Sequence, residues 1–244
     1  MIKLIISDLD GTLLPFGEVA LSSQISETIN KIISSGTHFC ISSGRDLCQL
    51  TALLPGITDK IYLISFDGAL CTKEGRVLYE MPIPGEAVAY AARTSSEGAV
   101  LLHGIDRIYA LGDPPASLKS QVPTVPINSV KELPQGVRIY KITKFEKPLP
   151  GSPTSPLRLH WDGKATGCFE YLCRFANKGA AAKDLQNRLM LTPYDTAALG
   201  DGENDVALFK AAAVRICVGD RSEKLQSLAT HTVPEGKRGL LLLK

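Results

Sequence analysis

The sequence predicts an α/β protein with a doubly wound, Rossmann-like parallel-sheet core that is interrupted by an inserted α+β domain. Two observations predict this fold. Strand and helix signals alternate over residues 2–65 and again after Lys178, as they do in strand–helix–strand units. Between these two stretches the signals are mixed. We therefore expect residues 1–82 and 178–244 to form the core and residues 83–177 to form the insert.

The first part of the core contains three expected strands. Residues 2–7 form a nearly continuous apolar run, typical of a strand buried on both faces of a parallel sheet. Residues 25–33 carry isoleucines at helical spacing, and strands are expected at 39–42 and 61–65. Asp46 is a candidate N-cap for a helix after the second strand. This order implies parallel pairing with right-handed crossovers.

The remaining elements follow from the same signals. A hairpin is expected over residues 69–80, where a K-E-G turn separates two apolar runs. The insert mixes helix and strand patterns, and the alternation of the core then resumes. We expect helices at 86–97, 180–190 and 206–213, and strands at 99–111, 137–145, 157–161, 166–175, 196–199 and 214–218.

Composition limits the classes of partner. The 244 residues are 44% hydrophobic and 21% charged, with a formal net charge of only +2. A nucleic-acid partner usually requires a concentrated basic patch, and the basic residues here are scattered among acidic ones. The apolar runs at both ends are too short for a signal peptide or a membrane span. We expect a cytoplasmic protein with neither a nucleic-acid nor a membrane partner, and the oligomeric state is not indicated.

The first expected strand ends in a pair of acids. Open parallel sheets bind ligands at the carboxyl ends of their strands, and Asp8 and Asp10 lie at such an end within the sequence D-L-D-G-T-L. Residues two apart near a strand end point the same way. Two carboxylates placed that close favour a cation beside them, and oxygen ligands suit Mg²⁺. A simple strand-terminating turn is the alternative interpretation of D-x-D.

Two further strand ends carry polar residues. Ser43, Gly44 and Arg45 could form an anion site leading into a helix, although a Ser-Gly turn is common for structural reasons. The segment 200–205, G-D-G-E-N-D, places acids four residues apart, with an amide between them, in a glycine-rich turn that opens a helix. That pattern suits metal ligation, with helix capping as the alternative.

One cation is expected to offset the charge of a bound phosphate. Lys178 stands at the predicted start of a helix, where a lysine opposes the helix dipole. This unfavourable placement suggests a functional role. Lys183 is the competitor, but it lies about 140° around the helix, so both cannot easily face one site.

These motifs together resemble those of the haloacid dehalogenase superfamily, in its Cof-like, sugar-phosphatase branch. The D-L-D-G-T-L segment resembles the first motif, Ser43 with its S-G-R sequence the second, and the N-K-G segment at Lys178 the third. Residues 200–205 resemble the fourth motif, G-D-x-x-N-D. The insert between the second and third motifs resembles a type IIB cap, and the motifs cover the whole chain.

The resemblance implies a role for each matching residue. Asp8 would form an aspartyl-phosphate, and Asp10 would act as the general acid and base. Ser43 and Lys178, with Gly44 and Arg45, would hold the phosphoryl oxygens. Asp8, Asp201 and the main-chain carbonyl of Asp10 would hold Mg²⁺. Asp205 would be a further ligand or would lie beside the ligands. Asn204 would orient phosphate or Lys178.

The function implied is a Mg²⁺-dependent phosphatase that hydrolyses the phosphate monoester of a small metabolite, with sugar phosphates favoured by the cap type. A phosphomutase of the same superfamily is the nearest alternative. A phospho-acceptor signalling domain would need Asp67 as its acceptor, and an inactive binding module is a third alternative. Asp67 stands where the branch often has Asn, and it could read a substrate hydroxyl or simply form a turn. Arg107, Arg138, Lys141, Arg158 and His160 are candidate substrate contacts in the insert.

Overall fold

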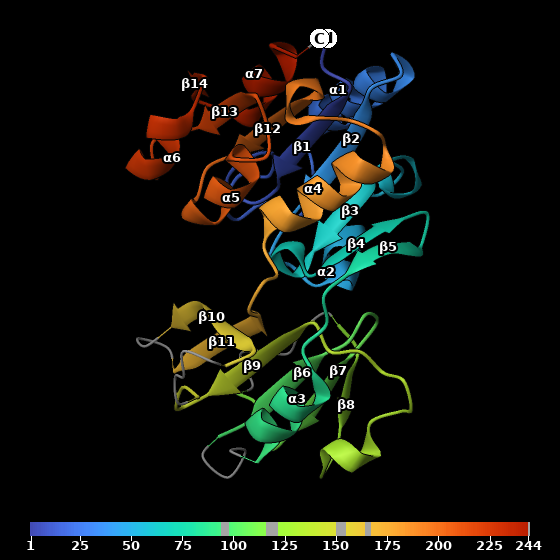
Figure 1. The fold of residues 1–244 in the computed structure, drawn as a ribbon, viewed down its shortest axis with the longest axis vertical. Coiled ribbons are helices and arrows are strands. Elements are labelled where there is room, and N and C mark those ends of the chain that lie inside the picture. The colour runs from blue at the N-terminus through green and yellow to red at the C-terminus, as the bar shows by residue number, and fades with distance from the viewer. Residues whose placement is uncertain (94–97, 116–121, 150–154, 164–166, 244) are drawn as a thin grey trace. The chain divides into compact units, whose positions relative to one another are not determined.

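The structure is a computed structural model, and it describes residues 1–93, 98–115, 122–149, 155–163 and 167–243, with backbone only for 161–163. The chain divides into two compact units. Unit 1 comprises Met1–Arg45, Leu50–Glu80 and Asn177–Lys244, and unit 2 comprises Asp46–Gln49 and Met81–Ala176. Figure 1 shows the elements of both units.

Unit 1 is built on an eight-stranded sheet of order β14-β13-β12-β1-β2-β3-β4-β5. Its strands from β14 to β3 pair in parallel, and β4 and β5 add an antiparallel hairpin at one edge. The strands are β1 (Leu4–Asp8), β2 (His38–Ser42), β3 (Tyr62–Ser65), β4 (Leu70–Lys73), β5 (Arg76–Glu80), β12 (Thr196–Gly200), β13 (Val214–Val218) and β14 (His231–Val233).

Helices cover this sheet because its central strands are apolar on both faces. On β1, Leu4 and Ile6 pack in one cluster with Leu185 and Leu208, while Ile5, which points to the opposite face, is equally buried. The helices of unit 1 are α1 (Ser23–Ser34), α2 (Leu47–Ala52, which begins in unit 2), α4 (Lys178–Arg188), α5 (Val206–Phe209), α6 (Glu223–Leu228) and α7 (Gly236–Leu241). The predicted fold class is confirmed.

Unit 2 has a six-stranded sheet of order β10-β11-β9-β6-β7-β8. All of its pairings are antiparallel except that of β7 with β8. Ala99, Leu101, Ile108 and Phe145 belong to its apolar cluster. Its elements are α3 (Gly85–Ala92), β6 (Val100–His103), β7 (Ile108–Leu111), β8 (Thr124–Pro126), β9 (Lys141–Phe145), β10 (Leu157–Gly163) and β11 (Cys168–Cys173).

Several elements differ from the sequence-based expectations. The helix expected at 206–213 ends at Phe209, and the strand expected at 137–145 begins only at Lys141. The end of the helix expected at 86–97 falls on residues 94–97, outside the described part of the chain. The short elements β8, β14, α6 and α7 were not predicted. These segments have three to six residues, too few for hydrophobic periodicity to reveal.

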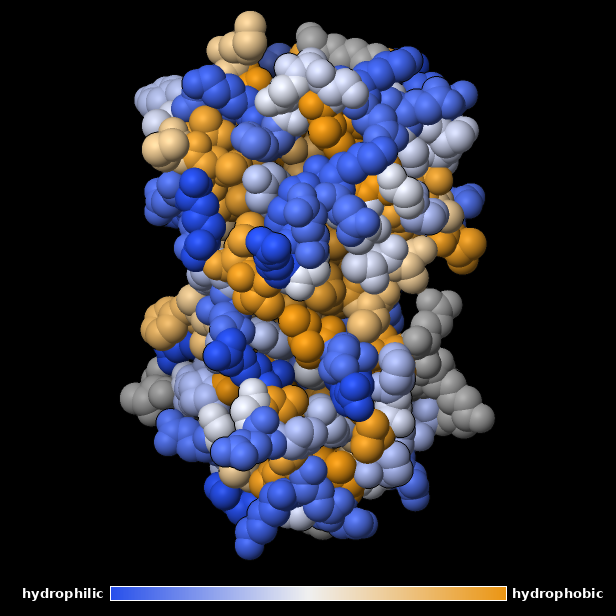
Figure 2. All heavy atoms as spheres, turned by 90° about the vertical axis from the view of Figure 1, so that its right-hand side faces the viewer, coloured by the Kyte–Doolittle hydropathy of each residue, from blue (hydrophilic) through white to orange (hydrophobic). Residues whose placement is uncertain are grey.

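Hydrophilic and hydrophobic residues are interspersed over both units on the face that Figure 2 shows. This distribution agrees with the balanced composition and the small net charge of +2. Within the described ranges, no helix combines the length and the apolar character that crossing a bilayer demands.

Candidate active site

The carboxyl ends of β12, β1 and β2 lie side by side in unit 1, because β1 pairs in parallel with both of its neighbours (Figure 1). Asp8 is the last residue of β1, Ser42 ends β2, and Gly200 ends β12. The loops that follow these strands therefore start from one edge of the sheet. Three of the four motifs are brought together by strand pairing alone.

Lys178 links the first motif to the fourth. Its Nζ donates hydrogen bonds of 2.6 Å to Asp8 Oδ1 and of 2.6 Å to Asp205 Oδ1. The Lys178 side chain has no exposed surface, and neither has Asp205. Although burial opposes its charge, the carboxylates of Asp205 and Asp8 hold the pKa of Lys178 above its ordinary value. The lysine therefore carries its charge at the centre of the site.

Asp205 organises the fourth motif. Its Oδ2 accepts hydrogen bonds from the backbone N–H groups of Asp201 at 3.1 Å and of Gly202 at 3.2 Å. Its Oδ1 is the atom bonded to Lys178. Burial raises the pKa of Asp205, while the neighbouring Lys178 opposes that rise. Both of its oxygens thus have protein partners, which makes Asp205 a structural centre for the turn after β12.

The acids Asp8, Asp201 and Asp205 are close enough to share a cation. Each offers one carboxylate oxygen, and these atoms all lie within 4.8 Å of one another. Asp8 Oδ2 is buried and has no hydrogen-bond partner among the described residues. Burial raises the pKa of Asp8 to about 8, and the charges of Asp205 and Asp201 add to the rise.

Three buried carboxylates outnumber the two cations beside them, which are the buried Lys178 and the exposed Arg221. The remaining negative charge is costly in a buried site unless a further cation offsets it. An oxygen-only donor set suits a hard divalent cation such as Mg²⁺. The residues present therefore fit a metal ion.

Asp10 has different partners from Asp8. Arg45 donates to the Asp10 carboxylate through Nε, at 2.9 Å from Oδ2, and through Nη2, at 2.7 Å from Oδ1. Ser43 Oγ donates to Asp10 Oδ2 at 3.4 Å. These hydrogen bonds to Asp10 raise the pKa of Arg45. The Asp10 carboxylate thus lies beside the second motif and does not belong to the three-acid cluster, which leaves only its main-chain carbonyl as the expected metal ligand.

The position of Lys178 depends on its neighbours in the chain. Asn177 caps α4, since its side chain accepts a hydrogen bond from the N–H of Ala180 at 2.9 Å. Gly68 lies against the 177–178 backbone, and a Cβ on Gly68 would come within 2.2 Å of the Asn177 carbonyl carbon and oxygen. Only glycine permits this approach. Lys183, the competing lysine, is exposed.

Asn204 and Asp67 pair with each other at the edge of the site. Asn204 Nδ2 donates to Asp67 Oδ1 at 3.2 Å. Asp67 has a positive φ of 51°, an unusual conformation for a residue other than glycine. Its carboxylate is one of the charges that raise the pKa of Lys178. Asp67 therefore forms the turn after β3 and also adds negative charge near the lysine.

Sequence reasoning missed two side chains that contact Asp201. Thr12 Oγ1 donates to Asp201 Oδ1 at 3.4 Å, and Arg221 Nη1 donates to Asp201 Oδ2 at 2.7 Å. A signal for Arg221 was available, because it follows the strand expected at 214–218. Polar residues after that strand also start from the carboxyl edge of the sheet.

Unit 2 holds a second ionic cluster, which is centred on Asp46. His103 Nδ1 lies 2.7 Å from Asp46 Oδ2, and His103 Nε2 lies 2.9 Å from Thr143 Oγ1. Lys141 Nζ lies 2.8 Å from Asp46 Oδ1 and 3.5 Å from Glu170 Oε1. Lys141 was a candidate substrate contact, but the structure buries it in this network.

Two other candidate substrate contacts in the insert have protein partners. Arg158 donates to the carbonyl of Ala176 at 2.6 Å. Arg107 is exposed and pairs with its sequence neighbour Asp106.

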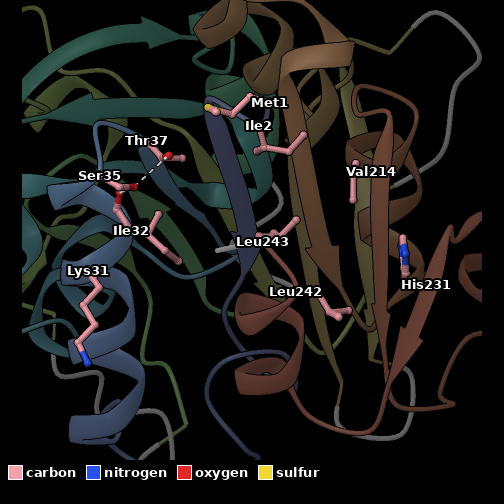
Figure 3. Close-up of a pocket in the computed structure, with 10 residues that line it drawn as sticks. All are labelled: Met1, Ile2, Lys31, Ile32, Ser35, Thr37, Val214, His231, Leu242 and Leu243. Atoms are coloured by element: carbon pink, nitrogen blue, oxygen red, sulfur yellow. Dashed lines mark hydrogen bonds between the residues drawn. The ribbon is translucent and has the colours of Figure 1, made fainter.

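A cavity of about 900 Å³ lies elsewhere in unit 1 (Figure 3). Its lining includes Ile2, Val214 and His231, which stand at the amino ends of β1, β13 and β14. These ends lie at the opposite edge of the sheet from Asp8. The residues that line this cavity include no carboxylate side chain, so it lacks the chemistry of the acid cluster.

Comparison with known proteins agrees with this site. The family model for haloacid dehalogenase-like hydrolases matches residues 5–239. A relative named HMP-PP phosphatase, from Yersinia pseudotuberculosis serotype O:1b (strain IP 31758), is 26% identical, and the match covers 93% of this chain and 87% of that protein.

Solved structures share the fold over the whole chain. One from Eubacterium rectale has a TM-score of 0.87 at 20% identity, covering 100% of this chain and 99% of that chain. A haloacid dehalogenase-like hydrolase from Bacteroides thetaiotaomicron has a TM-score of 0.83 at 18% identity and covers 100% of both chains.

The chain belongs to the haloacid dehalogenase-like hydrolase family, and it is an enzyme of the phosphatase class. The predicted family is thereby confirmed. Membership also removes the signalling-domain interpretation, in which Asp67 would have been the phospho-acceptor.

Proposed function

We propose that this enzyme is a Mg²⁺-dependent phosphatase that hydrolyses the phosphate monoester of a small metabolite, with a sugar phosphate as the favoured substrate. The reaction would pass through an aspartyl-phosphate on Asp8. The observation that carries the proposal is the buried cluster of Asp8, Asp201 and Asp205, which each offer an oxygen within 4.8 Å of the others. Within this cluster, Asp8 Oδ2 has no hydrogen-bond partner in the described part of the chain. A nucleophile and a cation site would then lie together.

Asp8 and Asp201, with the main-chain carbonyl of Asp10, would hold the cation. Asp205 would be a further ligand or would orient the turn through the two N–H groups that it already accepts. When bound, a divalent cation neutralises negative charge on the phosphoryl oxygens and on the acids around them. Lys178 and Ser43 would contact the same oxygens, supported by the backbone at Gly44 and by Asn204.

The chain's own residues would carry out two steps. In the first, an oxygen of Asp8 attacks phosphorus, the bond from phosphorus to the substrate oxygen breaks, and Asp10 donates a proton to the departing alkoxide. In the second, Asp10 takes a proton from water, which attacks phosphorus and releases phosphate and free Asp8. Arg45 holds both oxygens of Asp10, so it would orient that carboxyl group.

The sugar-phosphate preference rests on the insert. Its resemblance to a type IIB cap supports a role for residues 83–177 in substrate selection, with residues 1–82 and 178–244 as the catalytic core. The relative from Yersinia is named an HMP-PP phosphatase, so the substrate screen needs to extend beyond sugars. A cytoplasmic location would suit a small metabolite as substrate.

A screen of phosphorylated metabolites for phosphate release tests the proposal. We expect turnover with Mg²⁺, loss of turnover in EDTA, and recovery when Mg²⁺ is added back. Asp59→Asn is the matched control for the Asp8→Asn protein described below, because Asp59 is an exposed carboxyl of unit 1. Full turnover after thorough removal of metal would refute the role of the cation.

Rapid quenching followed by peptide mass spectrometry tests the covalent step. A phosphoryl group is expected on the peptide that contains Asp8, and not on that peptide in Asp8→Asn protein. Phosphate release from a single monophosphate, without a bisphosphate activator, separates hydrolysis from the phosphomutase alternative. A quenched enzyme that carries its phosphoryl group on another residue would overturn the mechanism.

A further inference from the structure

An exposed arginine and an exposed aromatic ring lie beside Asp201 and have no part in the mechanism above. The guanidinium carbon of Arg221 lies 4.4 Å from the centre of the Phe16 ring, which is a cation–π contact. The Arg221 side chain is 59% exposed, and Phe16 is 64% exposed. Both residues belong to unit 1, the unit that holds the acid cluster.

The Phe16 ring of this pair also lies against the loop that follows Asp8 and Asp10. Gly11 follows Asp10 and has a φ of +81°, and a Cβ on it would lie 2.3 Å from Asp201 Oδ2 and 2.6 Å from Phe16 Cζ. The ring and the Asp201 carboxylate therefore meet at the backbone of the first motif. The pair is one side chain away from the site that would hold the cation, and it is open to solvent.

Arg221 makes one hydrogen bond among the described residues, through Nη1 to Asp201 Oδ2. Its other N–H groups have no partner there, and a guanidinium presents five donors in a fork that suits carboxylates and phosphates. A cation bound by Asp201 would interact with the same carboxylate that attracts Arg221. The attraction between Arg221 and Asp201 would then weaken, leaving the guanidinium free to pair with an anion.

We propose that Arg221, supported on the Phe16 ring, recognises a second anionic group of the substrate. The preferred substrates would then carry, besides the reacting phosphoryl group, either a second phosphate, as in a diphosphate, or a carboxylate. This inference rests on the proposed phosphatase function and adds a specificity-determining residue to it. The alternative is that Arg221 only neutralises Asp201.

Exposure favours the substrate role. Lys178 already supplies a fully buried cation to the acid cluster, whereas Arg221 and Phe16 leave most of their surface accessible. A group that acts only on Asp201 gains nothing from an open guanidinium and an open ring. A group that receives ligands requires both to be accessible, and the ring keeps the flexible arginine in one place.

Three matched aryl substrates test the proposal: phenyl phosphate, 4-carboxyphenyl phosphate and phenyl diphosphate. We expect the parent enzyme to prefer one or both of the compounds with a second anionic group. Arg221→Gln should lower kcat/KM for a preferred compound about 10–100-fold, mainly through KM, because a charge-assisted hydrogen bond is lost. The loss for phenyl phosphate should be several times smaller. The comparison of 4-carboxyphenyl phosphate with phenyl diphosphate shows whether Arg221 recognises a carboxylate or a phosphate.

Two variants serve as controls. Arg221→Lys should retain part of the preference, because it keeps the charge but not the fork. Arg238→Gln removes another exposed arginine of unit 1, one that pairs with Glu235, and should leave the preference intact. Thermal unfolding of each variant shows whether it is folded.

Binding measurements keep the inference separate from the proposed function. Calorimetry on Asp8→Asn protein, with and without Arg221→Gln, gives the ratio of Kd values for phenyl phosphate and phenyl diphosphate without any turnover. Failure of the parent to release phosphate from any metabolite of the screen would reject the proposed function, whereas this Kd ratio would still test the role of Arg221.

Mg²⁺ binding to the substrate-free protein should be unchanged or tighter in Arg221→Gln, because a competing cation has been removed. Equal losses for all three aryl compounds, an unchanged Kd ratio, or weaker Mg²⁺ binding in Arg221→Gln would each overturn the inference.

Discussion

The described residues of each unit include a buried ionic cluster, and these two clusters differ in their balance of charge. The cluster in unit 1 gathers Asp8, Asp201 and Asp205 around the buried Lys178, and the exposed Arg221 pairs with Asp201. In the cluster of unit 2, Lys141 and His103 both contact Asp46, and Glu170 completes it. Buried charges without compensation are costly, so an unbalanced cluster indicates a missing positive charge and a balanced one does not.

The pKa shifts of the two clusters run in opposite directions. Burial and the neighbouring acids raise the pKa of Asp8 to about 8. Although burial acts in the same direction on Asp46, His103 and Lys141 overcome it and hold the pKa of Asp46 well below its usual range. The comparison shows that burial alone does not identify a functional carboxylate. The raised pKa of Asp8 agrees with the cation site proposed in unit 1.

The largest expected effect separates the clusters by activity. Asp8→Asn should lower kcat about a thousand-fold or more, because an amide cannot replace the nucleophile. Asp46→Asn should keep most of the turnover, because its partners lie in unit 2 and not among the acids of the active site. Phosphate-release kinetics of both variants provide the measurement. Similar losses in the two variants would contradict the division of roles.

The next largest expected effect is a difference between the two clusters in the free energy of unfolding. In EDTA, Lys178→Met should lower the free energy of unfolding by about 3–5 kcal/mol, because Asp8 and Asp205 lose the buried partner that they share. Lys141→Met should cost less, since Asp46 keeps His103. Denaturant titrations of both variants measure the difference. Mg²⁺ should recover part of the loss in Lys178→Met and none in Lys141→Met, and equal recovery would count against a cation site in unit 1.

A smaller effect concerns pH in the metal-free protein. The pKa of Asp8 lies above its ordinary value of 3.8, so the folded state binds more protons than the unfolded state between about pH 4 and pH 8. The contribution of Asp8 to stability is therefore complete below that range and is lost as pH rises through it. The pKa of Asp46 is lowered, so its contribution is present above about pH 4 and is lost as pH falls further.

Unfolding free energies measured in EDTA between pH 3 and pH 8 (about the range in which these carboxyls titrate) test both signs. Asp8→Asn should flatten the decline on the alkaline side, and Asp46→Asn should flatten it on the acid side. Added Mg²⁺ should also flatten the alkaline side in the parent protein. A parent protein whose stability rises steadily from pH 4 to pH 8 in EDTA would contradict the raised pKa of Asp8.

The smallest expected effect comes from an exposed ion pair. Arg188 and Asp184 pair across one turn of α4, and both side chains are partly exposed. Arg188→Gln should change the free energy of unfolding by only about 0.3–0.5 kcal/mol, because solvent screens such a pair. Its urea midpoint should stay close to that of the parent. A loss as large as that of Lys178→Met would mean that burial does not control these energies.

The sequence by itself determined the alternating core, the insert and the motifs at the strand ends. These features depend on local patterns: apolar runs mark buried strands, helical spacing marks amphipathic helices, and the acids at Asp8 and in the segment 200–205 follow such strands directly. Parallel pairing then brings those ends to one edge of the sheet, which is why the candidate site could be predicted without coordinates.

Only the tertiary structure decided which charged groups meet. Asp46 was expected as a helix cap, and its carboxylate lies against His103 and Lys141, which come from distant strands. Arg221 reaches Asp201 across 20 residues of chain. Its position after the strand at 214–218 indicates the edge of the sheet at which it lies, but not its contact with Asp201. Periodicity is a property of neighbours in sequence, whereas the partner of a buried charge is set by long-range packing and by the cost of leaving that charge unpaired.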